Sequence, residues 1–270
     1  MSGMHPGRSR LPAAIFAWLV VAFALLPLGI MFMMSFSSSE FVRFPPPGYS
    51  LRWYEAYFNS GDWVDATIRS LLLGVVVSSL SVLLGVPASL AINRMGGRSA
   101  NAALAVATLP IILPPVVIAV AMYMTFSKLG LVGTYAGLVV GHLTLALPFV
   151  VFAPLAPLRG RGPEYSRAGL SLGASRTRVV MTVVLPMIRP GILSGALLAF
   201  LTSFDELLIS LFIGNPTIRT LPRRMWDGVR SEFDPTIAAA SAVVVASTLI
   251  VALAVAGLSR LAQRSLISRT

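Results

Sequence analysis

Apolar residues in this chain are gathered into six long stretches that are separated by shorter polar connections. The stretches cover residues 11–34, 67–92, 101–126, 134–157, 191–213 and 236–258. Each is long enough to supply the roughly 20 apolar residues that a helix needs to cross a bilayer. The pattern therefore predicts an all-α membrane protein with six transmembrane helices, in a single domain over residues 1–270.

Small residues recur along the second stretch at positions that allow helices to approach closely. They are Gly74, Ser78, Ser81, Gly85, Ala88 and Ser89. We interpret them as packing positions. Several stretches also contain prolines, which helix bundles tolerate when neighbouring groups satisfy the freed backbone atoms.

The composition agrees with a membrane location. Hydrophobic residues make up 56% of the chain and charged residues only 11%, whereas about 25% of residues are charged in soluble domains. The first apolar stretch is too long for a signal-peptide core, so we expect an uncleaved helix. The chain has no cysteine, and its two histidines, His5 and His142, lack an accompanying acidic cluster. The sequence therefore predicts no disulfide and no catalytic, cofactor-binding or metal-binding residues.

Arginines are concentrated in alternate connections. If the N-terminus is inside, the cytoplasmic segments hold 13 arginines and one acid, Glu164, whereas the external segments hold eight cations and seven acids. Because lysine and arginine accumulate on the cytoplasmic side of membrane proteins, we predict that both termini are cytoplasmic. Topology then explains the formal net charge of +11, and we expect a lipid bilayer and no nucleic acid as partner.

Two longer connections lie on the external side, at residues 35–66 and 214–235. The first contains three consecutive prolines followed by aromatic residues that suit a membrane interface, including Trp53, Tyr54 and Tyr57. We predict a short amphipathic helix near 51–59 that lies on the membrane surface.

The connection at residues 158–190 is long, basic and organised. Pro163 suits the first turn of a helix, and Glu164 sits at the positive end of that helix's dipole. The helix can run to about residue 172, where Gly173 supplies a left-handed cap. A second helix over 174–184 should end at Leu185 and Pro186, which would redirect the chain towards the membrane.

Such a loop is typical of a docking element. Ala168 and Gly169 would let a partner approach closely, and the arginines would steer association. The alternative is a solvated basic loop that only enforces topology.

The loop resembles the glycine-centred cytoplasmic signature of ABC importer permeases. Gly173, Ala174 and the ending Val183-Val184-Leu185-Pro186 stand in matching places. The family's Glu-Ala-Ala triplet is replaced by Arg167, Ala168 and Gly169. The stretches SLRWYEAYF and SFDELLISLFI are similar to the spermidine/putrescine type of permease subunit.

The resemblance implies a MetI-like bundle of the type I importers, in the bacterial inner membrane. The ATPase-coupling residues would be Glu164, Arg167, Ala168, Gly169, Gly173, Ala174, Leu185 and Pro186. The first loop helix would be the coupling helix, seated in a groove of a separate ABC ATPase subunit. It also implies an external solute-binding protein and a second permease subunit, either a different but similar chain or a second copy.

This chain has no G-x-x-x-x-G-K-[ST] phosphate loop of its own. We therefore expect no cofactor, ATP being bound by the partner subunit, and no enzymatic activity in this chain.

Asp205 and Glu206 fall inside the fifth apolar stretch. Ionised groups at such depth normally face the bundle interior or a water-filled cavity. They would attract a cationic substrate such as a polyamine, form a structural pair, or join a proton relay that includes His142. Beside the importer, two other functions stay open: an ion-coupled secondary transporter that uses Asp205 and Glu206, and a membrane-embedded enzyme.

Overall fold

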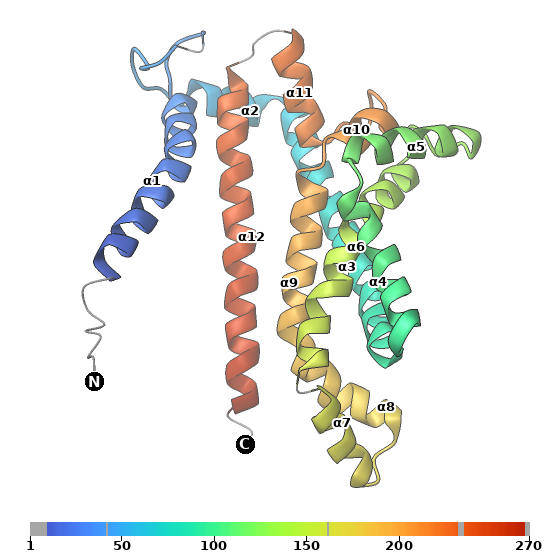
Figure 1. Ribbon diagram of the computed structural model, residues 1–270. Helices are drawn as coiled ribbons and strands as arrows, with labels where there is room; N and C mark the ends of the chain where they lie inside the picture. Colours follow the sequence, from blue (N-terminus) through green and yellow to red (C-terminus); the bar gives the residue numbers. More distant parts are fainter. Residues whose placement is uncertain (1–9, 42, 161, 232–234, 268–270) are drawn as a thin grey trace. The chain divides into compact units, whose positions relative to one another are not determined.

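The computed structural model describes residues 10–41, 43–160, 162–231 and 235–267, and these residues are nearly all helical (Figure 1). The helices are α1 (Arg10–Ser35), α2 (Arg52–Asn59), α3 (Gly61–Arg94), α4 (Gly97–Ile112), α5 (Pro115–Lys128), α6 (Tyr135–Arg159), α7 (Gly162–Ser171), α8 (Arg176–Val179), a π-helical turn η1 (Val180–Val184), α9 (Leu185–Phe204), α10 (Leu208–Ile213), α11 (Leu221–Ser231) and α12 (Thr236–Ile267). The chain divides into two compact units, one made of residues 1–61 and 227–246 and the other of residues 62–226 and 247–270.

Five helices in the described part of the chain are long and apolar enough to cross a membrane. They are Pro12–Ser35, Gly61–Arg94, Tyr135–Arg159, Arg176–Phe204 and Thr236–Val255. The predicted span 101–126 is not one helix, because α4 and α5 meet at an angle of 99°. Two adjacent prolines, Pro114 and Pro115, explain the break: a residue before proline avoids helical geometry, and Leu113 and Pro114 are both extended. A sixth span exists if this bent pair crosses as one element.

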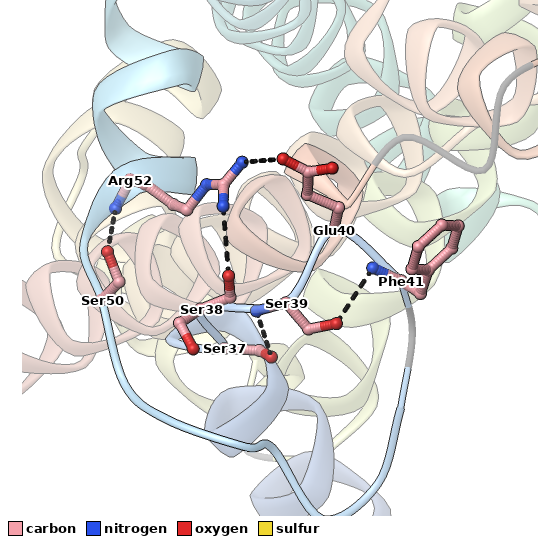
Figure 2. Close-up of polar contacts among 7 residues, drawn as sticks. All are labelled: Ser37, Ser38, Ser39, Glu40, Phe41, Ser50 and Arg52. Atoms are coloured by element: carbon pink, nitrogen blue, oxygen red, sulfur yellow. Dashed lines mark hydrogen bonds and ion pairs between the residues drawn. The ribbon is translucent and has the colours of Figure 1, made fainter.

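The first unit contains α1 and the loop that leads to α2. The guanidinium of Arg52 pairs with Glu40 at 2.9 Å and donates to the carbonyl of Ser38 at 3.1 Å (Figure 2). Backbone bonds from Ser38 to Gly48 and from Ser50 to Phe36 close the same loop. The predicted helix near 51–59 is confirmed as α2, and Arg52 at its start fastens it to the loop.

The second unit is built around the packing of α6 against α9. Glycines of α9 bring the two backbones together: a Cβ on Gly195 would lie 3.0 Å from the Cα of Val150, and one on Gly191 would lie 2.9 Å from the carbonyl oxygen of Ala153. Side chains at these positions would force the helices apart. The sequence analysis did not single out this pair, although a Gly-x-x-x-Gly spacing is a known contact signal in membranes.

The small residues of α3 pack as predicted. Gly74 faces the ring of Phe200, and the Ser78 hydroxyl donates to the carbonyl of Ala196 at 2.8 Å. Gly85 lies against Val150. These contacts place α3 beside both α6 and α9.

The connection at 214–235 contains α11, a helix that the sequence analysis did not predict. The backbone N–H of Leu221 donates to the hydroxyl of Ser70 at 2.7 Å, and the Arg224 guanidinium lies 4.5 Å from the centre of the Trp63 ring. The start of α11 is therefore anchored to the beginning of α3.

Candidate functional site: the coupling loop and the break after helix α9

The first loop helix, α7, ends in the way that its sequence predicts. Gly173 has a φ of +81°, the left-handed conformation that glycine adopts without a steric penalty. Its N–H donates to the carbonyl of Leu170 at 3.0 Å, and the N–H of Ala174 donates to the carbonyl of Gly169 at 3.2 Å. This pair of bonds is a Schellman motif, which satisfies the last carbonyls of the helix and turns the chain sharply.

The solvent-exposed face of α7 carries several of the predicted coupling residues. Glu164, Arg167 and Ala168 are exposed, and Leu172, which follows the helix, is 88% exposed. Gly169 differs, because a Cβ there would lie 3.0 Å from a methyl of Val179. Its missing side chain therefore lets the two halves of the loop pack together, whereas Ala168 lies open to a partner.

The second half of the loop does not end at Pro186 as predicted. Ser175 caps it by accepting from the N–H of Arg178, and α8, η1 and α9 then form one continuous helix over Arg176–Phe204. Proline lacks the N–H that an α-helix needs and clashes with the preceding turn. The wider π turn accommodates it: the N–H of Leu185 bonds to the carbonyl of Val180, five residues earlier. Leu185 and Pro186 are half-buried inside this helix.

The predicted fifth span, 191–213, is interrupted at the two acids. Helix α9 ends at Phe204, where the N–H of Asp205 makes the last bond, to Leu201. The carboxylate of Glu206 accepts from the N–H of Ile209 at 3.0 Å, so it caps the following helix α10. An unpaired N–H at a helix start in a membrane would be costly, which explains why a carboxylate stands here. Asp205 is exposed, and its side chain has no hydrogen bond or ion pair within the described residues.

His142 of α6 joins the two sides of this break. Its side chain is completely buried. Nδ1 lies 3.0 Å from the Ser203 hydroxyl and 3.1 Å from the Ser203 carbonyl, and Nε2 lies 3.2 Å from the Ser210 hydroxyl. The imidazole thus connects the end of α9 to α10. The other histidine, His5, lies outside the described residues.

The structure therefore separates the predicted residues into two groups, one at each end of α9. From Pro186 to Asp205 the helix extends about 29 Å at 1.5 Å per residue. Loop and acids do not meet, but a single helix connects them. The serines that hold His142 were missed by the sequence analysis, because they are 61 and 68 residues away along the chain.

Comparison with known proteins gives consistent results. Residues 80–268 match the family model described as binding-protein-dependent transport system inner membrane component. The spermidine/putrescine transport system permease protein PotC of Haemophilus influenzae is 26% identical over 234 residues, which are 87% of this chain and 91% of PotC. The putrescine transport system permease protein PotI of Escherichia coli K12 is 28% identical over 256 residues, 90% of this chain and 91% of PotI. The molybdenum transport system permease protein ModB of Mycobacterium bovis is 32% identical over 201 residues, 69% of this chain and 76% of ModB.

Solved structures share the fold. A bacterial alginate ABC transporter, in complex with an alginate pentasaccharide-bound periplasmic protein, superposes with a TM-score of 0.67 at 18% identity, over 94% of this chain and 95% of that chain. The MetNI methionine ABC transporter, in an inward-facing conformation, superposes with a TM-score of 0.60 at 18% identity, over 75% of this chain and 99% of that chain. The fold is thus one that two ABC transporters named for different substrates have in common.

Proposed function

This chain belongs to the family of binding-protein-dependent transport system inner membrane components, and we propose that it forms half of the translocation pathway of an ATP-driven importer. It is a permease component of an ABC importer and a multi-pass membrane protein. A second permease subunit would complete the pathway, a different but similar chain in preference to a second copy. An external binding protein would deliver the solute, and both termini would lie in the cytoplasm.

The observation that supports this proposal is the continuous helix between the loop and the acids. On the surface of helix α7, Glu164, Arg167 and Ala168 are exposed to solvent. A separate ATPase subunit on the cytoplasmic side would bind this surface in a groove. Because Gly169 has no side chain, Val179 can pack closely against it and the two halves of the loop stay together. The backbone bonds of Gly173 and Ala174 fix the turn between the halves. A movement of the loop would then pass through Leu185 and Pro186 into α9.

At its far end, α9 would carry that movement to the break at Asp205. Because His142 ties Ser203 to Ser210 across the break, α9 and α10 would move together. ATP-driven closure of two ATPase subunits would in this way change which side of the membrane the acids face. The ATP would bind to those partner subunits, and this chain would need no cofactor.

For the cargo we propose a small organic cation, such as a polyamine. The exposed carboxylate of Asp205 would attract a positive charge, while Glu206 is engaged in capping α10. The names of PotC and PotI point to the same class, and these relatives cover 87–90% of this chain. ModB, which is named for molybdenum transport, covers a smaller share.

The test is to purify the complex through a tag on this chain, identify the subunits by mass spectrometry, and reconstitute it in proteoliposomes with its binding protein. We expect an ATPase subunit to copurify and labelled polyamine to enter only when ATP is supplied. A chain that purifies alone and transports without ATP would instead be the ion-coupled secondary transporter that uses Asp205 and Glu206. ATP-driven uptake of molybdate in place of polyamine would contradict the cargo class alone.

A further inference from the structure

A cavity lies between the end of α3 and the base of the coupling loop. Its volume is about 430 Å³. Its lining includes Asn93 and Arg94 of α3, Ser166 of α7, and Arg176 of α8. A second opening of about 360 Å³ shares Arg94 and Arg176 with the first. The two arginines therefore stand where both hollows meet.

The polar part of this site is positively charged and unpaired. Among the described residues that line the two hollows, none is acidic. Within the part of the chain that the structure describes, the side chains of Arg94 and Arg176 make no ion pair and no hydrogen bond. Asn93 and Ser166 add side-chain donors. Guanidinium groups with amide and hydroxyl donors are the groups that bind phosphate oxygens.

Apart from the two arginines and Thr177 of α8, the residues that line the second hollow are apolar. Pro87, Leu90 and Ala91 of α3 form one side, and Val180 and Met181 of the π turn form the other. Helix α3 is a candidate membrane span that ends at Arg94, so these apolar residues lie on the membrane side of the two arginines. A fitting ligand has a phosphate attached to a hydrocarbon chain.

We propose that this site binds the headgroup of an anionic phospholipid, with its phosphate between Arg94 and Arg176 and an acyl chain along Pro87 and Leu90. The proposal rests on the cytoplasmic orientation of the loop that belongs to the proposed function. Basic pockets beside membrane helices on the cytoplasmic side are suited to such headgroups. The lipid would tie the end of α3 to the loop and thereby strengthen coupling.

The lipid would not compete with the ATPase for α7. The residues of α7 that line the first cavity are Gly162, Ser166 and Leu170. At 100° per residue, Glu164 and Ala168 lie on the opposite side of the helix. One face can therefore hold the lipid while the other contacts the ATPase.

The experiment uses the complete complex, with its ATPase and binding protein, in vesicles of phosphatidylcholine alone or mixed with phosphatidylglycerol. The variants are R94Q, R176Q and the double variant. The control is R98Q, which removes an exposed arginine next to the same end of α3 but outside both hollows. ATP-driven uptake and the phosphatidylglycerol retained on purification, measured by native mass spectrometry, are both recorded.

We expect phosphatidylglycerol to raise uptake by the native complex and by R98Q. An arginine near an anionic surface contributes about 1 kcal/mol, so lipid retention should fall about fivefold for each arginine removed. The proposal is overturned if the double variant retains as much phosphatidylglycerol as the native complex and is stimulated by it to the same extent. Stimulation of uptake by inorganic phosphate in phosphatidylcholine vesicles would also overturn it, because the ligand would then be a soluble anion. Failure of the proposed function is a separate result, since no ATPase would then copurify with any variant.

Discussion

Replacing Gly173 with valine tests the turn between α7 and α8 most directly. The residue has a φ of +81°, and nothing lies within 4 Å of the position that a Cβ would take. A side chain would therefore meet no neighbour, and the substitution acts through backbone strain alone. Both bonds of the Schellman motif, from Gly173 to Leu170 and from Ala174 to Gly169, depend on that conformation.

The strain can be estimated from the conformation. A non-glycine residue in the left-handed region costs about 1–3 kcal/mol, and a β-branched residue belongs at the upper end. If the variant keeps its helices, the population with a correctly turned loop should fall about 5-fold to 150-fold, at 1.4 kcal/mol for each factor of ten. Asparagine tolerates this region better than other residues, so Gly173→Asn should retain most of the function that Gly173→Val loses.

The assay is ATP-driven uptake by the reconstituted complex, together with the amount of ATPase recovered with the tagged chain. The control is Gly130→Val, because Gly130 also has a positive φ, +67°, and open space around it, but it follows α5 and lies outside the loop. We expect a large loss for Gly173→Val, a small one for Gly173→Asn and little change for Gly130→Val. Equal uptake by the valine and asparagine variants would refute the role of the left-handed turn.

Three further predictions concern the membrane part. His142→Ala should lower the melting temperature of the solubilised complex, because the buried Ser203 hydroxyl loses its partner, at about 1–3 kcal/mol for an unsatisfied group, and Ser210 keeps only its bond to the carbonyl of Glu206. Thr144→Ala on the same helix should not lower it, since the exposed Thr144 hydroxyl bonds only to its own helix. Equal melting temperatures for the two variants would contradict the bridging role. Larger side chains at Gly195 should destabilise the chain, because they would push α9 away from α6: Gly195→Ala less, and Gly195→Leu by about 1–3 kcal/mol. Thermal unfolding measures both variants, and unchanged melting temperatures would contradict the close approach of α6 and α9. Asp205→Asn should reduce uptake of a labelled polyamine without changing the melting temperature. Glu206→Gln should leave uptake near normal, because an amide oxygen can still accept from the N–H of Ile209. A larger loss of uptake in Glu206→Gln than in Asp205→Asn would exchange the roles of the two acids.

The elements that sequence reasoning placed correctly are those with local signals. The helix α7 and its end at Gly173 follow from a proline and an acid at the start and a glycine at the end, all within a dozen residues. The short helix α2 follows from three prolines and an aromatic pattern. Such signals act through the backbone of neighbouring residues, so they need no knowledge of the rest of the fold.

The structure differs from the sequence analysis where an apolar stretch is compatible with two different structures. Residues 101–126 are hydrophobic on both sides of Pro114 and Pro115, so hydropathy cannot distinguish a straight span from a bent pair of helices. The fifth stretch is similarly apolar beyond Asp205, although the helix ends before it. The adjacent prolines and the adjacent acids were the available signals. The bonds of His142 had no such signal, because their partners come from distant parts of the chain.

The π turn over Val180–Val184 sets the angular position of everything that follows it in α9. It holds one residue more than an α-helical turn, and each residue turns a helix by about 100°. If the same residues were wound as an ordinary α-helix, α9 would be rotated by about 100° relative to the loop. Gly191 and Gly195 would swing away from α6, and larger side chains would take their place against it. The π winding of this turn, more than the identity of any side chain within it, therefore sets the rotation of the membrane helix relative to the loop.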